Sequence, residues 1–240
     1  MNILLDASTY HTFDILISIA LIILSYLIGS IPFGLVFGKM IKGVDIRKYG
    51  SKNIGTTNSI RVLGKKVGYL VFFFDVFKGM LVILIVKALN TAGVWVTPID
   101  ELWYGAAAIL GHSFSIYLGF KGGKAVAVSL GVVLITTPLS AISCTIVFAI
   151  LLLATGYVSL GSTFATLTVL ISAWLLHFLG MDITPNAFND FGTYLIGKTS
   201  LQLCIMLSFA ATLIIYKHIS NYKRLINGTE NSFKKKKQTQ

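Results

Sequence analysis

The stretch GKMIKGVDIRKYGSKNIGTTNSIRVLGKK, residues 38–66, decides how the rest of the chain is organised. It carries eight of the twenty Lys and Arg residues and lies between two long apolar segments. It is therefore a loop tied to a membrane at both ends. Its centre, GSKNIGTTN at 50–58, is rich in glycine, hydroxyl and amide groups. Glycine lets several backbone N–H groups converge on one point, and such a concave shape binds anions.

A loop with this charge has a second interpretation, in which it serves only to fix the topology, because cytoplasmic loops of membrane proteins carry an excess of Lys and Arg. A loop that only fixes the topology needs basic residues and no other residue type. This role gives no reason for the glycine, hydroxyl and amide groups at 50–58. We therefore expect this cluster, together with Arg61, to bind an anionic group.

The composition predicts an integral membrane protein. Of the 240 residues, 55% are hydrophobic and 12% are charged, with a mean hydropathy of +0.80, whereas a soluble domain has about 25% charged residues. The formal charge is +11. Nucleic acid is not the expected partner, because the basic residues lie between apolar segments. Cys144 and Cys204 both fall within apolar segments and form neither a disulfide framework nor a zinc spacing.

The apolar pattern predicts an all-α polytopic protein with about seven transmembrane helices. A spanning helix needs about 20 apolar residues. No charged residue occurs between 125 and 181, and two turn signals divide that region into three spans rather than two. We expect one integral-membrane domain over 1–226 and a basic, disordered tail over 227–240. The predicted spans are 15–37, 67–86, 102–120, 123–137, 139–154, 160–179 and 199–216.

Three ionisable residues fall inside the predicted spans. Asp75 and Lys78 are three residues apart, which places them on one face of a helix. They form either an internal ion pair or part of a functional site, because an unpaired charge in lipid is costly. His112 is either a packing residue or a site residue.

The topology predicts where the polar stretches meet. With seven spans, the loop 38–66, the loop 111–124, the turn at 156–162 and the stretch 218–224 lie on one side of the membrane. That side carries seventeen of the twenty basic residues, so we expect it to be cytoplasmic. The N-terminus is then outside and the C-terminus cytoplasmic. An even number of spans would put the basic tail on the opposite face from the first loop.

These four stretches supply the groups that bind phosphate: Arg and Lys charges, backbone N–H groups and hydroxyls. The sequence has no HExxH motif, no paired carboxylates and no Cys–His nucleophile pair, so we expect no metal and no cofactor. KGGK at 121–124 lacks the spacing of a nucleotide P-loop. The pattern suits an enzyme that joins a phosphate-bearing substrate to a hydrophobic chain. There are two alternatives: a small anion transporter lined by Asp75, Lys78 and His112, and a scaffold protein.

Several spaced motifs occur in one order along the chain: GSIPFG at 29–34, GSKNIGTTN at 50–58, GHSF at 111–114, FKGGK at 120–124, YVSLGS at 157–162, HISN at 218–221 and GTE at 228–230. With these motifs the sequence resembles, over nearly its whole length, the bacterial membrane acyltransferases of the PlsY family, which move a fatty acyl group from acyl phosphate to glycerol 3-phosphate.

The resemblance implies a seven-span enzyme of the bacterial cytoplasmic (inner) membrane, with its active site at the cytoplasmic face. It implies formation of 1-acyl-glycerol 3-phosphate (lysophosphatidic acid) and phosphate in phospholipid biosynthesis, with membrane lipids as surroundings. It assigns to glycerol 3-phosphate the residues Ser51, Arg61, Lys124, Ser159, His218 and Asn221. The other substrate-binding positions, mostly for the acyl phosphate group, are Gly55, Thr56, Thr57, Asn58, His112, Gly122, Gly123 and Ser162.

Two positions depart from the family pattern. Ala125 stands where the family usually has glycine, and Gly156 stands where a basic residue is common. Lys223 or Arg224 is expected to replace that missing charge. Because acyl phosphate is already activated, we expect direct attack by the glycerol hydroxyl, with a substrate phosphate taking the proton. His218 as general base is the alternative.

Overall fold

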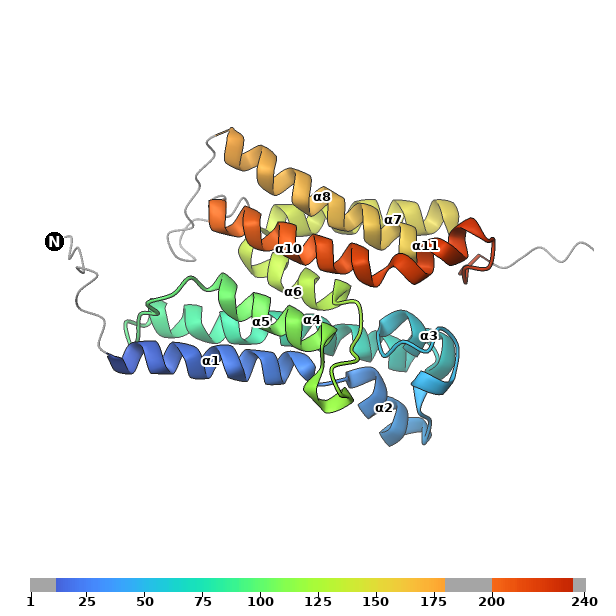
Figure 1. Ribbon diagram of the computed structural model, residues 1–240, viewed down its shortest axis with the longest axis horizontal. Coiled ribbons are helices and arrows are strands. Elements are labelled where there is room, and N and C mark those ends of the chain that lie inside the picture. Colours follow the sequence, from blue (N-terminus) through green and yellow to red (C-terminus); the bar gives the residue numbers. More distant parts are fainter. Residues whose placement is uncertain (1–11, 180–199, 235–240) are drawn as a thin grey trace, which may run out of the picture.

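The computed structural model describes residues 12–179 and 200–234, and every regular element in those ranges is helical. This confirms the predicted all-α class. The elements, in chain order, are α1 (Thr12–Ser30), α2 (Phe33–Lys42), η2 (Ile46–Lys48), α3 (Thr56–Leu63), α4 (Lys65–Thr91), α5 (Leu102–Ser113), η3 (Ile116–Leu118), α6 (Val126–Thr136), α7 (Pro138–Thr155), α8 (Val158–Phe178), α10 (Leu201–Lys217) and α11 (Ile219–Ile226) (Figure 1).

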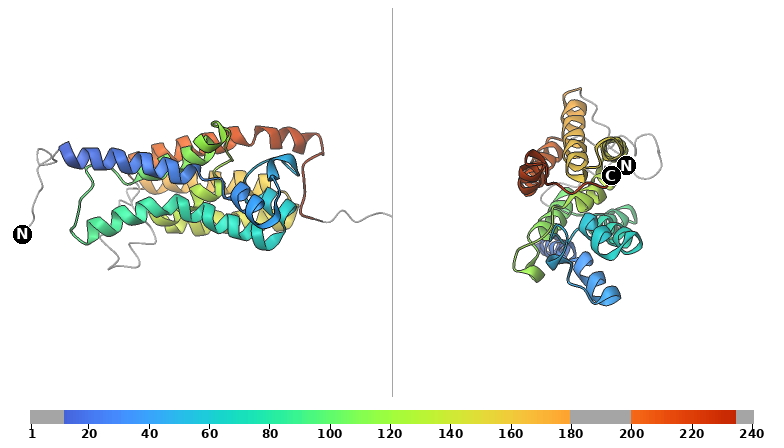
Figure 2. Two further views of the ribbon diagram at one scale, coloured as in Figure 1. Left: turned by 90° about the horizontal axis from the view of Figure 1, so that it is seen from below. Right: turned by 90° about the vertical axis from the view of Figure 1, so that its right-hand side faces the viewer.

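The longer helices lie side by side along one direction, and the short helices α2, α3 and α11 gather at one end of the bundle (Figures 1 and 2). Within the described ranges, α1, α4, α7 and α8 are long and apolar enough to cross a membrane. A fifth crossing is added if α10 and α11, which meet at 47°, form one bent span. Each predicted span therefore contains a helix, while the count of seven stays a prediction.

Two predicted spans end earlier than expected. The first was predicted to reach residue 37, but α1 ends at Ser30 and the chain restarts as α2. Pro32 causes the break, because it lacks an N–H group and disfavours helical backbone at the residue before it. The third span was predicted to reach residue 120, but α5 ends at Ser113. Both breaks lie near the polar end of the bundle.

The broken ends of α1 and α5 are held against each other by hydrogen bonds. The Ser115 hydroxyl donates to the Ser30 carbonyl over 2.6 Å, and the Ser30 hydroxyl donates to the Gly111 carbonyl over 3.2 Å. The Tyr26 hydroxyl donates to the Phe114 carbonyl over 2.7 Å. These bonds satisfy carbonyl groups that have no partner where the two helices end. Inside a membrane such groups must be hydrogen-bonded within the protein.

Small and branched side chains fill the interior. One cluster joins α4, α5 and α6 through residues such as Val82, Ile83 and Val128, and a second joins α7, α8 and α10 through residues such as Ala141 and Leu207. Glycine lets helices approach closely, as membrane helix pairs often require. A Cβ at Gly29 would lie 2.3 Å from the Ala108 carbonyl oxygen. This contact sets α1 directly against α5.

The segment 227–234 lies across the polar end of the bundle. It belongs to the stretch 227–240 that is predicted to be a disordered tail, and the structure describes residues 227–234 in contact with the turn between α7 and α8. The Phe233 N–H donates to the Gly156 carbonyl over 2.8 Å, and the Lys234 ammonium donates to the Ala154 carbonyl. Residues 235–240 lie outside the described part of the chain.

Candidate functional site

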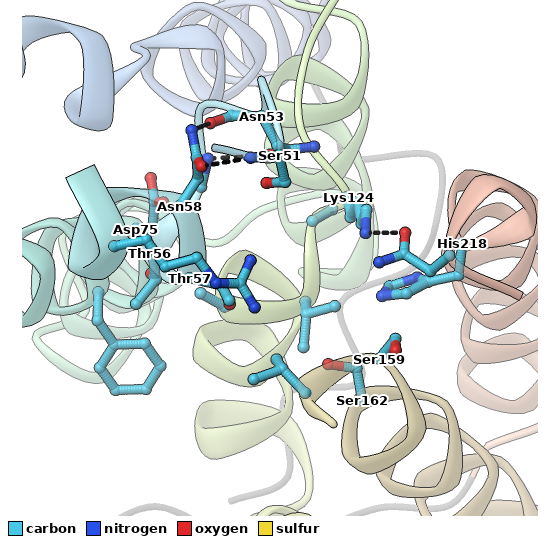
Figure 3. Close-up of a pocket in the computed structure, with 18 of the residues that line it drawn as sticks. Ser51, Asn53, Thr56, Thr57, Asn58, Asp75, Lys124, Ser159, Ser162 and His218 are labelled. Atoms are coloured by element: carbon cyan, nitrogen blue, oxygen red, sulfur yellow. Dashed lines mark hydrogen bonds between the residues drawn. The ribbon is translucent and has the colours of Figure 1, made fainter. Parts of the chain in front are cut away.

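A polar cavity of about 150 Å³ opens at the end of the bundle where the broken helices meet. Its wall comes from four stretches that are distant in sequence, as the predicted topology requires (Figure 3). Of the predicted site residues, the cavity is lined by Ser51, Gly55, Thr56, Thr57, Asn58, Arg61, His112, Lys124, Ser159, Ser162, His218 and Asn221.

The loop 50–58 is shaped by Asn58, which is fully buried. Its amide NH₂ donates to the backbone carbonyls of Ile46, Tyr49 and Asn53, and its side-chain oxygen accepts from the Ser51 N–H over 2.8 Å. Asn58 was predicted to bind the acyl phosphate group. In the structure its polar atoms are instead engaged within the loop.

The same loop aims the start of α3 at the cavity. Gly55 precedes the helix, and its N–H is held by the Asn53 side chain over 2.9 Å. Thr56 and Thr57 begin the helix and line the cavity. The first N–H groups of a helix have no partner within it and favour an anion. This end of α3 can therefore receive a phosphate group.

Lys124 enters the cavity from the loop before α6, and its ammonium donates to the Asn221 side-chain oxygen (Figure 3). Burial lowers the pKa of Lys124 to about 8, against the opposing effect of the Glu230 charge. The next residue, Ala125, has a φ of +58°, in the left-handed region that favours glycine. A glycine would adopt this conformation with less strain than alanine.

Glu230 also lines the cavity, although it is not among the site residues predicted from the sequence. Its carboxylate accepts hydrogen bonds from the Ser159 hydroxyl over 3.1 Å, the Asn221 amide over 2.7 Å and the Arg224 guanidinium over 2.7 Å. The side chain is only 5% exposed. Burial favours the neutral acid, but these hydrogen bonds outweigh it and hold the pKa of Glu230 below its ordinary value.

The GTE motif at 228–230 was the available sequence signal for Glu230. Arg224, which was expected to replace a missing basic residue, is paired with Glu230. At Gly156, the position of that missing residue, a Cβ would lie 2.9 Å from the side chain of Lys234. Lys234 thus occupies the space near Gly156.

Segment 227–234 also contacts Arg61. The Arg61 guanidinium donates to the Asn231 carbonyl over 3.1 Å and lies 5.0 Å from the centre of the Phe233 ring.

His218 enters from the bend between α10 and α11. Its Nδ1 lies 2.8 Å from the Ile214 carbonyl, and a carbonyl only accepts, so Nδ1 is the donor. In the neutral ring, the Nε2 of His218 is then left as an acceptor.

Asp75 and Lys78 form an ion pair of 2.7 Å inside the bundle. The Lys78 ammonium also donates to the Ile31 carbonyl over 2.7 Å, at the break between α1 and α2. Asp75 lines the polar cavity. The two interpretations drawn from the sequence are therefore compatible, because the pair is internal and also borders the site.

Gly122 and Gly123 are not among the residues that line the cavity. Their predicted role in binding the acyl phosphate group stays a prediction. The Gly122 N–H donates to the Ser113 carbonyl over 3.2 Å, and the Gly123 N–H donates to the His112 carbonyl over 2.9 Å. The backbone donors expected to bind a phosphate are used to close the end of α5.

A second, apolar cavity of about 260 Å³ adjoins the polar one. It is enclosed by α6, α7, α8 and α10, with side chains such as Val133, Cys144, Val169 and Leu207. The two cavities have four lining residues in common: Phe72, Val126, Ala127 and Phe148. The site therefore joins a polar chamber that contains basic side chains to an apolar chamber with the character of a hydrocarbon-binding cavity.

Comparison with known proteins gives a consistent result. A family model described as glycerol-3-phosphate acyltransferase matches residues 19–228. A glycerol-3-phosphate acyltransferase of Acholeplasma laidlawii is 41% identical over 238 residues, covering 93% of this chain and 96% of the relative. One from Bacillus subtilis (strain 168) is 40% identical over 210 residues, covering 88% and 94%.

A solved structure is also similar. It is the crystal structure of PlsY (YgiH), an integral membrane glycerol 3-phosphate acyltransferase, in its glycerol 3-phosphate form. The TM-score is 0.73 at 38% sequence identity, and the match covers 90% of this chain and 96% of that one. The lysophosphatidic acid form of PlsY matches with a TM-score of 0.71 at 37% identity.

Proposed function

The chain belongs to the glycerol-3-phosphate acyltransferase family, and from this premise we propose that it transfers a fatty acyl group from acyl phosphate to the 1-hydroxyl of glycerol 3-phosphate. The products are 1-acyl-glycerol 3-phosphate and inorganic phosphate. The membrane acyltransferase assignment and the place in phospholipid synthesis follow from the family. The acyl phosphate donor is the part that we add.

The observation that carries the proposal is the junction of the two cavities. Phe72, Val126, Ala127 and Phe148 line both the polar and the apolar chamber. A donor made of a phosphate joined directly to a fatty acyl group has its polar and apolar parts only one bond apart. Such a donor fits a site in which the phosphate chamber adjoins the hydrocarbon chamber.

We assign the acceptor, glycerol 3-phosphate, to Ser51, Arg61, Lys124, Ser159, His218 and Asn221. Arg61 and Lys124 supply the positive charge for its phosphate. The donor phosphate is assigned to the start of α3, where Gly55, Thr56 and Thr57 face the cavity. Asn58 acts through the loop that it shapes, and Ser162 lines the polar cavity from the first helical turns of α8.

In the proposed reaction the glycerol hydroxyl oxygen attacks the acyl carbonyl carbon. A new C–O bond forms as the bond from that carbon to the phosphate oxygen breaks, and phosphate leaves with the electron pair. The hydroxyl proton passes to a substrate phosphate oxygen. Lys124 and the start of α3 offset the developing negative charge, and the enclosed site holds the two substrates in line.

His218 is the alternative proton acceptor, because its Nε2 is free to accept. We expect His218→Gln to retain substantial turnover at saturating substrate, since glutamine keeps hydrogen-bonding capacity but cannot act as a base. The measurement is kcat of the purified variant beside that of the wild type. A loss of turnover by several orders of magnitude, with unchanged Michaelis constants, would assign the base role to His218.

We place the protein in the bacterial cytoplasmic membrane, with the polar end of the bundle and the C-terminus on the cytoplasmic side and the N-terminus outside. The charge distribution of the sequence supports this orientation, since seventeen of the twenty basic residues fall in the stretches that are predicted to lie on that side. Glycerol 3-phosphate, a soluble anion, then reaches the cavity from the cytoplasm.

The direct test offers purified protein radiolabelled glycerol 3-phosphate with acyl phosphate in one reaction and with acyl-CoA in another. We expect labelled lysophosphatidic acid with acyl phosphate alone. Equal or faster product formation from acyl-CoA would contradict the proposed donor. Phosphate uptake into vesicles, without any acylated product, would instead favour the anion transporter.

A further inference from the structure

His112 was expected to contact substrate, but its main packing contact is with the loop that follows α5. A Cβ added to Gly123 would lie 2.2 Å from Nε2 of His112. The side chain of His112 is 5% exposed, so the ring fills the space directly behind the backbone of Gly123. The Gly123 N–H also donates to the His112 carbonyl over 2.9 Å. His112 thus contacts Gly123 through both its backbone carbonyl and its imidazole ring.

The other side of the ring faces the buried ion pair. His112 Nδ1 lies 3.8 Å from Oδ1 of Asp75, which is paired with Lys78 at 2.7 Å. Within the described chain, His112 Nδ1 has no hydrogen-bond partner, and the Asp75 Oδ1 nearest to it is already paired with the Lys78 ammonium. Lys78 is in turn fixed to the Ile31 carbonyl. The ring is therefore backed by a rigid group that is anchored at the break in the first membrane helix.

Lys124 follows Gly123 directly, and its ammonium lies in the polar cavity beside Asn221. Ala125 then turns the chain through a left-handed conformation into α6. With α6 packed in the bundle, the loop has little freedom on that side. The surface of the His112 ring is therefore the boundary that sets how far Gly123, and with it the Lys124 backbone, lies from the cavity.

We propose that His112 is a positioning residue for Lys124: its ring, backed by Asp75 and Lys78, supports Gly123 and so holds the Lys124 ammonium where the acceptor phosphate binds. This rests on the proposed function, because it assigns that phosphate to Lys124. It also gives a physical reason for glycine at 123, since any side chain there would meet the ring.

The test is a double-mutant cycle between His112→Ala and Gly123→Ala. The added methyl at 123 collides with the imidazole, so removal of the imidazole should relieve the collision. Gly122→Ala is the matched control. A Cβ at Gly122 would lie 2.0 Å from the His112 backbone oxygen, which His112→Ala leaves in place. The two glycines are adjacent and differ in which part of His112 they meet.

We expect Gly123→Ala to raise the KM for glycerol 3-phosphate roughly tenfold or more, with a smaller effect on kcat. His112→Ala should raise the same KM modestly. The double variant His112→Ala/Gly123→Ala should resemble His112→Ala alone, whereas His112→Ala should give Gly122→Ala no relief. The proposal would be overturned if the effects of His112→Ala and Gly123→Ala on this KM were additive. It would also be overturned if His112→Ala reduced the effects of Gly123→Ala and Gly122→Ala equally.

The unfolding temperature of each variant in detergent is the second readout. The collision at Gly123 should lower it, and His112→Ala should restore part of that loss, whether or not the enzyme is assayed. Changes in unfolding temperature with an unchanged KM for glycerol 3-phosphate would make the contact merely structural and overturn the positioning role. Failure of the proposed function is seen separately, as absence of product from wild-type protein with acyl phosphate.

Discussion

At the scale of single residues, the ionisation of Lys124 gives a testable pH dependence. Its pKa is about 8 in the folded protein, so the ammonium is charged below that pH and loses its charge above it. A phosphate group is already fully ionised there, since its second pKa is about 6. We expect the KM for glycerol 3-phosphate to rise roughly fivefold between pH 8 and 9, as the protonated fraction falls.

Lys124→Arg is the control for this prediction, because a guanidinium keeps its charge across the whole range. Its KM should be nearly constant between pH 7 and 9.5, whatever its absolute value. Initial rates at several glycerol 3-phosphate concentrations and each pH provide the measurement. An equally steep rise in the arginine variant would show that another group titrates.

Glu230 holds three groups of the site, so its removal should destabilise the protein. Glu230→Ala leaves Ser159, Asn221 and Arg224 without their shared acceptor. We expect a loss of about 1–3 kcal/mol in the free energy of unfolding, since unsatisfied buried donors cost that much. Thermal unfolding in detergent measures it. Exposed Thr229 offers a control, because Thr229→Ala should have little effect; equal stability of both variants would contradict the account.

The roles of Glu230 and Asn58 could not be predicted from sequence in physical terms. Glu230 lies in a polar, basic region whose composition is typical of a disordered tail, and its hydrogen bonds to α8 and α11 are long-range contacts that composition does not reveal. Asn58 belongs to a cluster that suits phosphate. Whether its amide faces the ligand or the loop depends on backbone turns that composition does not determine.

At the scale of helices, the apolar cavity predicts a chain-length limit. Val169 lies seven residues beyond Ser162 on α8, about 10 Å deeper, whereas one leaflet of the hydrocarbon core is about 15 Å thick. We expect Val169→Phe to lower activity with long-chain acyl phosphates far more than with short ones. Rates with donors of increasing chain length measure this.

Ala127 provides the matched control at the mouth of the same cavity, where it lines both chambers. Ala127→Leu should impair donors of every chain length to a similar degree. If Val169→Phe also lowered all rates equally, or none, the apolar cavity would not be the acyl site.

The positions of the helices could be predicted from hydropathy, but their ends could not. Pro32 can interrupt a helix, yet the apolar run continues past it to Phe37. The break itself is stabilised by Lys78 at the Ile31 carbonyl, a contact between residues 47 positions apart. Hydropathy reports what a segment buries and carries no information on such a long-range partner.

At the scale of the whole molecule, the gathering of four polar stretches in one cavity was predicted from the odd number of helical segments. Labelling of single cysteines tests the orientation. In a variant without Cys144 and Cys204, we expect Lys48→Cys and Asn227→Cys to react with an impermeant reagent from the cytoplasmic side. Gly93→Cys should react from the outer side. Reaction of Lys48→Cys and Asn227→Cys from opposite sides would contradict the topology.

In the proposed reaction one pocket joins glycerol 3-phosphate to an acyl group that arrives as acyl phosphate. The most direct measurement uses glycerol 3-phosphate labelled in its phosphorus and unlabelled acyl phosphate with the purified protein. We expect all label to stay in lysophosphatidic acid and one unlabelled phosphate to be released per product. Label in the released phosphate, or product without an equivalent of phosphate, would contradict it.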